Sequence, residues 1–320
     1  MNSLTSPDIK ILRHPDRLAA FQSGRTAFPI SAEIDLTWRC ALNCKLCHSK
    51  WLHQDIELSQ DQIRRVLTQL HGHGAQAVTF TGGGDPLESP HWRYAVNLAH
   101  DLGFDQAVYS YLPRVDQKLV NFLASKLAFV YTHSCNTRGL SRPAASKTVW
   151  TYGWLLDESN WTQIPDMVRR TNLDFFNFVD FRPLCPENKP GSKPLDYGWI
   201  PDAVRLLKSE SARESRVKWA EYKFSGLQRR DAGRNYGACY STDFTTCIGP
   251  NGDVYECINR RGFPDSILGN LLTEDLAEIW KRKSRCRTDM SNCRIMCRNN
   301  SLNQTLWSVF GPEVQHSNFV

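Results

Sequence analysis

The sequence predicts an α/β protein whose parallel strands form an open or partial barrel, followed by a small cysteine-rich domain. Runs of apolar residues at strand length alternate with segments of helical length, which is typical of βαβ units. Cysteines gather in two places, one early in the chain and one near its end. With 320 residues, the chain is long enough for one large core and a smaller appended unit.

Six candidate strands precede residue 185, which are too few for a closed eight-stranded barrel. We therefore expect a partial (β/α)6 barrel. Its strands are predicted at residues 32–36, 77–80, 107–110, 128–131, 149–156 and 175–181.

The first helix of this series is predicted to begin after Ser59. Gln62 follows three residues later and completes a capping box, and Gly72 ends the helix. One apolar face runs along it, formed by Ile63, Val66, Leu67 and Leu70.

Four segments are expected along the chain. Four prolines between 183 and 197 mark a connection out of the barrel, and residues 202–222 are predicted to form a basic amphipathic helix. The segments are a lead-in packed on the surface (1–31), the barrel core (32–185), a linker with a helix (186–236) and a small metal-stabilised domain (237–320).

Composition excludes several classes of protein. The formal charge of +6, from 39 basic and 33 acidic residues, does not by itself imply a nucleic-acid partner. There is no run of about 18 apolar residues that would span a membrane, and the first residues lack the pattern of a secretion signal. We therefore expect a cytoplasmic protein, in which eleven reduced cysteines indicate metal binding or catalysis.

The first cysteine group, Cys40, Cys44 and Cys47, directly follows the first predicted strand. Its C-x3-C-x2-C spacing fits a loop around a cubane iron–sulfur cluster with one iron left open. A zinc site completed by His48, or three buried thiols, are the alternatives. The second strand ends in a glycine-rich turn, Thr81-Gly-Gly-Gly-Asp-Pro86.

Together these two motifs resemble those of the radical S-adenosylmethionine (SAM) superfamily. Cys40, Cys44 and Cys47 match the cluster motif of that superfamily, and residues 82–86 match its GGE-type motif, with Asp85 where glutamate is usual. A second difference is Leu46, where the family commonly has an aromatic residue.

The resemblance implies a radical SAM core in which the open iron binds the amino and carboxylate groups of SAM. Reductive cleavage of SAM would then give a 5′-deoxyadenosyl radical that abstracts hydrogen from a substrate carbon. The implied SAM contacts are Gly82, Gly83, Gly84 and Asp85. Further implied contacts, whose alternatives are ordinary caps or surface groups, are Ser134, Asn160 and Arg182.

The second cysteine group lies in the C-terminal region. Between Cys247 and Cys257, Asn251-Gly252 predicts a hairpin turn, and Leu268-Gly269-Asn270 follows. This region resembles the SPASM and twitch domains that hold auxiliary clusters. The resemblance implies one auxiliary [4Fe-4S] cluster, which would relay electrons, bind substrate or only stabilise the fold, with zinc as the alternative. Its expected ligands are Cys239, Cys247, Cys257 and Cys297, with Cys293 as the main rival and Cys286 spare.

A basic segment overlaps this region, and Asp289 is the one acidic residue within it. The segment either balances cluster charge or binds an anionic partner. Its members are Lys281, Arg282, Lys283, Arg285, Arg287, Arg294 and Arg298.

The resemblance leaves the substrate and the reaction subclass (oxidoreductase, isomerase or lyase) open. A small anionic metabolite is favoured, with a base in nucleic acid as second choice and a peptide or protein as a further alternative. Flavodoxin or ferredoxin is the expected electron donor by family precedent. The non-enzymatic alternative is a zinc-bearing module that binds nucleic acid, which would leave the glycine-rich turn without a purpose.

Overall fold

The strands of the protein form a single curved sheet. The computed structural model describes residues 7–42, 44, 47–133, 135–185, 195–228, 234–283 and 297–312. Along the sheet the strand order is β10-β9-β8-β1-β2-β3-β4-β5-β6-β7. The six predicted strands are present, parallel and in chain order, as β1 (Ser31–Asp35), β2 (Ala77–Thr81), β3 (Asp105–Tyr109), β4 (Phe129–Thr132), β5 (Val149–Leu156) and β6 (Phe178–Pro183).

The sequence predicted neither a strand directly after β6 nor the pairing of a strand of the C-terminal hairpin with β1. Strand β7 (Val217–Trp219) pairs with β6, and β8 (Thr245–Ile248) pairs with β1, both in parallel. An antiparallel hairpin of β9 (Asp253–Tyr255) and β10 (Ile267–Asn270) continues beyond β8. Among the described strands β7 and β10 lie at opposite ends, so the barrel is open, as expected.

The prediction of one helix over 202–222 was wrong. Helix α7 (Ile200–Arg213) ends at Glu214, whose backbone is extended, and β7 and α8 (Glu221–Gln228) follow. The carboxylate of Glu214 accepts hydrogen bonds from the Arg216 backbone and guanidinium at 3.0 Å and 2.6 Å. This local ion pair fixes the turn between helix and strand.

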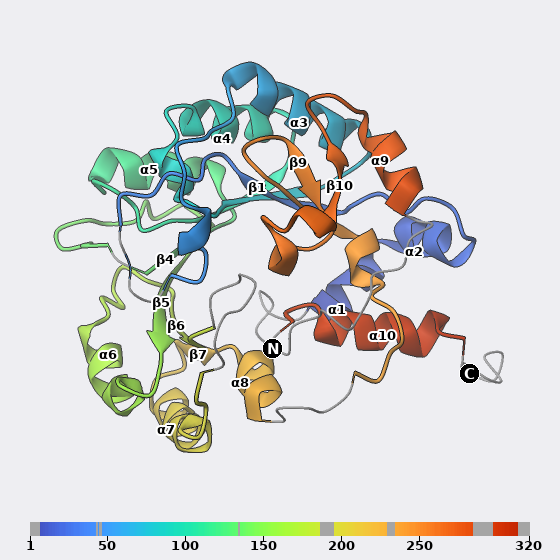
Figure 1. Cartoon of the computed structure of the whole chain (residues 1–320). Helices are drawn as coiled ribbons and strands as arrows, with labels where there is room; N and C mark the ends of the chain where they lie inside the picture. The colour runs from blue at the N-terminus through green and yellow to red at the C-terminus, as the bar shows by residue number, and fades with distance from the viewer. Residues whose placement is uncertain are drawn as a thin grey trace.

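Helices cover the outer face of the curved sheet (Figure 1). They are α3 (Gln60–Gly72), α4 (Trp92–Asp101), α5 (Gln117–Lys126), α6 (Ile164–Arg170) and α7. The capping box of α3 is confirmed, because Ser59 Oγ accepts from the Gln62 backbone at 3.3 Å and Gln62 Oε1 accepts from the Ser59 backbone at 2.8 Å. The four predicted apolar residues of this helix are buried.

The start of the chain packs against the C-terminal region. Helix α2 (Pro15–Gln22) and Ile11, which directly follows the short helix α1 (Pro7–Lys10), share an apolar cluster with Phe244 and with Leu302 and Leu306 of α10 (Asn300–Phe310). On α9 (Leu276–Lys283), Trp280 Nε1 donates to the Ala27 carbonyl at 2.8 Å. The two ends of the described chain are therefore held together.

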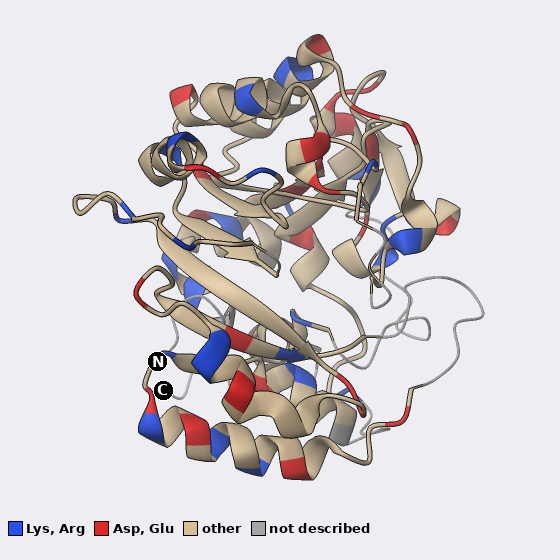
Figure 2. Cartoon of the chain, turned by 90° about the vertical axis from the view of Figure 1, so that its left-hand side faces the viewer, with Lys and Arg blue, Asp and Glu red and all other residues tan. Residues whose placement is uncertain are grey.

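Charged residues of both signs are interspersed over the outer helices (Figure 2). Several form pairs three residues apart on one helix, such as Asp202 with Arg205. In the described part of the chain, no helix is both long enough and apolar enough to cross a membrane.

Candidate functional site: two cysteine regions around a polar barrel interior

The first cysteine group and the glycine-rich turn meet at the carboxyl ends of β1 and β2. Asp35, the last residue of β1, accepts hydrogen bonds on Oδ2 from Trp38 Nε1 at 2.8 Å and from the Gly83 backbone at 3.0 Å. Cys40 lies on the loop that follows β1. Within this loop, the Cys47 backbone donates a hydrogen bond to the Cys44 carbonyl at 3.3 Å. Residues 43, 45 and 46, and with them the expectation for Leu46, lie outside the described residues.

The glycines of this turn are required by close packing against the chain just before Cys40. A Cβ added to Gly84 would lie 2.2 Å from the Arg39 carbonyl oxygen, and one on Gly83 would lie 2.7 Å from Trp38 Cδ1. At Gly82 the nearest atom would be the Gly84 carbonyl oxygen at 2.9 Å. The turn thus supports the loop that carries the three cysteines.

Asp85 is buried and braces the ends of β2 and β3. Its carboxylate accepts hydrogen bonds from the Leu87 backbone at 2.9 Å, from Ser110 Oγ at 2.8 Å and from the Tyr111 backbone at 2.8 Å. Burial raises the pKa of Asp85 to about 6. These contacts give Asp85 a structural task that the sequence did not indicate.

The three cysteines lie near enough to influence one another. Burial raises the pKa of Cys40 to about 11, and the neighbouring Asp85, Cys47 and Cys44 add to the effect. In the described chain no three cysteine, histidine or acidic side chains are arranged to hold a single metal ion. The C-x3-C-x2-C spacing of this loop fits the expected cubane cluster with one open iron, and zinc stays the alternative.

The other implied SAM contacts differ in their surroundings. Asn160 closes the turn after β5, since its side chain accepts from the Asp157 backbone at 3.0 Å and donates to the Leu155 carbonyl at 3.0 Å. Ser134 lies outside the described residues. Arg182 lies on β6 within the barrel interior.

Alternation along the strands places a group of polar side chains inside the barrel. Val108, Val130, Val179 and Phe181 belong to the apolar clusters, so their neighbours on β3, β4 and β6 face the opposite, concave side. We call this group the lumen cluster; it consists of Tyr109, Tyr131, His133, Asp180 and Arg182.

Contacts within the lumen cluster are specific. Asp180 Oδ2 accepts hydrogen bonds from Tyr131 Oη at 2.9 Å and from Arg182 Nε at 2.7 Å, while the guanidinium lies 4.0 Å from the centre of the Tyr131 ring. His133 Nδ1 lies 3.2 Å from the Gly153 carbonyl oxygen. Burial, and then the positive charge of Arg182, lower the pKa of His133 to about 4, so the imidazole is neutral at neutral pH.

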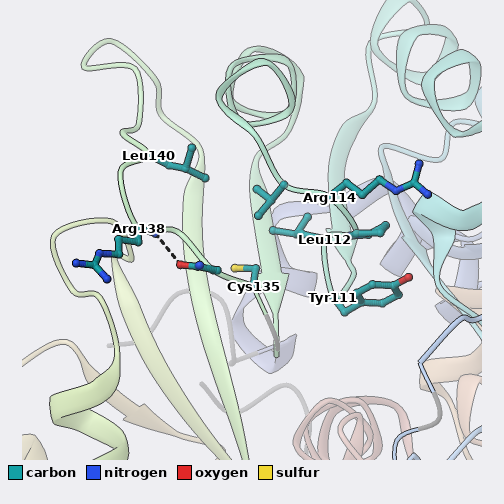
Figure 3. A pocket seen from close by; sticks show the side chains of 9 residues that line it. Tyr111, Leu112, Arg114, Cys135, Arg138 and Leu140 are labelled. Carbon is teal, nitrogen blue, oxygen red and sulfur yellow. Dashed lines mark hydrogen bonds between the residues drawn. The ribbon is translucent and has the colours of Figure 1, made fainter.

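A pocket of about 490 Å³ opens beside this cluster, between the loops that follow β3 and β4 (Figure 3). Leu112 and Arg114 line it with left-handed backbones, at φ 55° and 52°. Cys135 faces it from the other loop, and burial raises the pKa of its thiol to about 11. This thiol is therefore protonated at neutral pH.

In the C-terminal region, the structure brings together Cys239, Cys257 and Cys297. Burial raises the pKa of Cys257 strongly, and the neighbouring Cys297 and Cys239 raise it further. Asn303 Nδ2 lies 3.3 Å from Cys239 Sγ, and the Asn259 backbone donates to Cys257 Sγ at 3.4 Å. The remaining candidates, Cys286 and Cys293, lie outside the described residues.

Cys247 occupies a different environment from these three. It lies on β8, and its Sγ accepts a hydrogen bond from Arg261 Nε at 3.1 Å. Arg261 also binds Glu33 at 3.0 Å and Asp35 at 3.1 Å, both on β1. Burial, opposed by Arg261, raises the pKa of Cys247 to about 12.

Sequence reasoning missed this buried ion-pair network. The available signal was Glu33 and Asp35 themselves, two acids at alternate positions of an otherwise apolar strand. Such acids face one side of the sheet and require buried partners.

The described cations of the basic segment are paired with carboxylates. Lys281 binds Glu278 at 2.8 Å, Arg282 binds Glu274 at 2.6 Å, Lys283 binds Asp243 at 3.4 Å and Arg298 binds Glu33 at 2.5 Å. Acids from other parts of the chain therefore reach four of these cations, in addition to Asp289 within the segment itself. Arg285, Arg287 and Arg294 lie outside the described residues.

Comparison with known proteins identifies a family for the C-terminal region. Residues 239–304 match the SPASM family, described as an iron–sulfur cluster-binding domain, and contain the Cys239, Cys257 and Cys297 group. The Gly252 turn of the predicted hairpin has φ 85° and joins β8 to β9. The match confirms the expected SPASM-type cluster-binding domain in the C-terminal region.

Two solved structures illustrate the similarity of fold. SuiB of Streptococcus suis, bound to precursor peptide SuiA, is 14% identical, with a TM-score of 0.62 over 87% of this chain and 70% of that one. The anSMEcpe protein, with bound AdoMet and the Cp18Cys peptide, is 12% identical, with a TM-score of 0.58 over 86% of this chain and 88% of that one. No curated protein matches the sequence.

Proposed function

We propose that this protein is a radical SAM enzyme that abstracts hydrogen from a substrate carbon. The observation that carries the proposal is the loop of Cys40, Cys44 and Cys47, which rests on the glycine-rich turn at the carboxyl ends of β1 and β2. The carboxyl ends of parallel strands are where barrel enzymes place their active sites. The match of residues 239–304 to a cluster-binding domain supports a second, auxiliary cluster.

The roles of the chain's own residues follow from this geometry. Cys40, Cys44 and Cys47 would hold the first [4Fe-4S] cluster, and Cys239, Cys257 and Cys297 would belong to the auxiliary set. Asp35 and Asp85 hold the two loops in position. When bound, the reduced cluster and SAM supply a 5′-deoxyadenosyl radical, with electrons from a flavodoxin or ferredoxin.

A small anionic metabolite is the first candidate substrate. A peptide is the second, because SuiB and anSMEcpe were solved with peptides and share this fold. A nucleic-acid base loses support, since the described cations of the basic segment are already bound to carboxylates.

The test is SAM cleavage by anaerobically reconstituted protein, measured as 5′-deoxyadenosine. We expect about eight irons per chain, from two four-iron clusters. Replacing Cys40, Cys44 and Cys47 together by alanine should remove about half of this iron and all cleavage. Cleavage that persists in the triple variant would contradict the assignment.

A further inference from the structure

The barrel interior contains a guanidinium whose binding edge is open. Arg182 donates from Nε to Asp180 and stacks on Tyr131, but neither of its Nη nitrogens has a hydrogen-bond partner among the described residues. Its side chain is 22% exposed, so a ligand can reach it. Stacking and the Asp180 bond fix the plane of the group, which leaves its outer edge prepared for a ligand.

A second group of polar side chains lies near the lumen cluster and adds positive charge. Tyr222 of α8 lies near Arg182 and Lys223 of α8 lies near His133, while Arg298 of the C-terminal region lies near Tyr109 and Tyr222. Tyr109 and Tyr222 lie close enough to both Arg182 and Arg298 to affect the pKa of each guanidinium, so the two arginines flank the same space. The described hydrogen bond of Lys223 is a long one, 4.0 Å to Cys185 Sγ.

Neighbouring groups do not supply the missing partner. Asp180 is the one carboxylate bound to Arg182 in the described chain, and Glu33 is already engaged by Arg261 and Arg298. His133 is neutral at neutral pH. The space beside the lumen cluster therefore offers cationic and neutral hydrogen-bond donors, an environment that favours an anion.

We propose that Arg182 binds a carboxylate of the substrate through its two Nη groups. A guanidinium edge presents two parallel N–H bonds that match a planar carboxylate, which a lysine ammonium cannot reproduce. The proposal rests on the proposed function, because it identifies the lumen as the substrate side of that site. It also relocates the expected recognition of an anion from the basic segment to the barrel interior.

Geometry favours substrate over SAM as the source of this carboxylate. The cysteine loop and the glycine-rich turn follow β1 and β2, whereas Arg182 lies on β6, four strands further along the sheet than β2. Arg298, which lies near the lumen cluster, is also close enough to Cys257 to lower the pKa of its thiol. Arg182 therefore faces the side of the auxiliary cysteines.

The test measures binding to the anaerobically reconstituted full chain by calorimetry. The probes are succinate against succinamide, and a short glutamate-containing peptide against its glutamine counterpart. We expect at least one of the two acids to bind about tenfold or more tightly than its neutral partner, and Arg182→Gln to abolish this preference. The acid that binds distinguishes a metabolite from a peptide.

Controls separate this role from structural effects. Arg282→Gln removes an arginine that is already bound to Glu274 on the surface, and should leave both preferences unchanged. Arg182→Lys keeps the charge without the fork, and should bind the acid several times more weakly than wild type. If Arg182→Gln does not fold, the lysine variant carries the comparison.

Three results would overturn the proposal. The first is equal or absent binding of the acids and their neutral partners to the wild-type protein. The second is full acid binding by Arg182→Lys, and the third is loss of SAM affinity in Arg182→Gln, which would assign the carboxylate to SAM. None of these readouts requires turnover, so a failure of SAM cleavage would refute the proposed function separately.

Discussion

Gly84 gives the sharpest test of how the glycine-rich turn supports the cysteine loop. In Gly84→Ala the new Cβ would lie 2.2 Å from the Arg39 carbonyl oxygen and 2.5 Å from the Trp38 carbonyl carbon. Ordinary contacts begin at 3.4 Å, so the shortfall from 3.4 Å to 2.2 Å is 1.2 Å. Both contacts are backbone atoms, which cannot rotate away as a side chain would.

The backbone at Gly84 and the backbone at Arg39 would have to move apart. We expect this to lower the free energy of unfolding by about 3 kcal/mol, the upper end of the usual range for overpacking. For a chain of 320 residues the entropy of unfolding near 60 °C is about 0.7 kcal/mol/K, so that loss lowers the melting temperature by roughly 4–5 °C. Because Cys40 follows Arg39 directly, the displaced loop should also lose its cluster, and about half of the total iron with it.

The assays are thermal unfolding and iron content after anaerobic reconstitution. Gly72→Ala is the matched control, since Gly72 ends α3 and a Cβ there meets no atom within 4 Å. This control should be neutral or slightly stabilising. A Gly84→Ala protein with the melting temperature and iron content of wild type would refute the packing argument.

Three further predictions follow from single contacts. Burial raises the pKa of Asp85 from 3.8 to about 6, so its stabilising contribution is present below pH 3.8 and is lost as the pH rises to about 6. Asp85→Asn should therefore reduce the fall in stability between about pH 5 and 7 by about 1 kcal/mol in thermal unfolding, and an unchanged slope would count against it. Ser59→Ala should cost about 1 kcal/mol through loss of the α3 cap, measured by denaturant unfolding; no change would show that the cap is unimportant. Asn270 makes side-chain hydrogen bonds of 2.9 Å with Asn251, Asp253 and Leu272, so Asn270→Ala should cost about 3 kcal/mol and lower auxiliary iron; wild-type iron and stability would contradict this.

Sequence patterns predicted the parts of the fold that depend on local periodicity. The parallel order β1 to β6, the α3 capping box and the hairpin at Gly252 are all visible as spacing of apolar, capping or turn residues. The position of the cysteine loop and the glycine-rich turn follows from the same pattern, because each comes directly after a predicted strand.

Long-range pairing and buried polar contacts were not predictable in this way. Strand β7 has only three residues, too few for a clear alternation, and β8 was assigned only to a local hairpin. The lumen cluster joins residues from different strands, such as Tyr131 and Asp180, which are 49 positions apart. Nothing in the local sequence fixes such partners, since they depend on how the strands are ordered in space.

The pairing of β8 with β1 has a mechanical consequence. Four residue pairs, from Ser31 with Thr245 to Ile34 with Ile248, join the C-terminal region to the first strand of the barrel. The loop of the first cysteine group follows the end of β1, and the hairpin of β9 and β10 follows β8. The two cysteine regions are thus anchored on paired strands of one sheet. Cleavage of the backbone between them would therefore release neither fragment. We therefore expect any widening of the barrel for an incoming molecule to occur at the opposite border of the sheet, at β7.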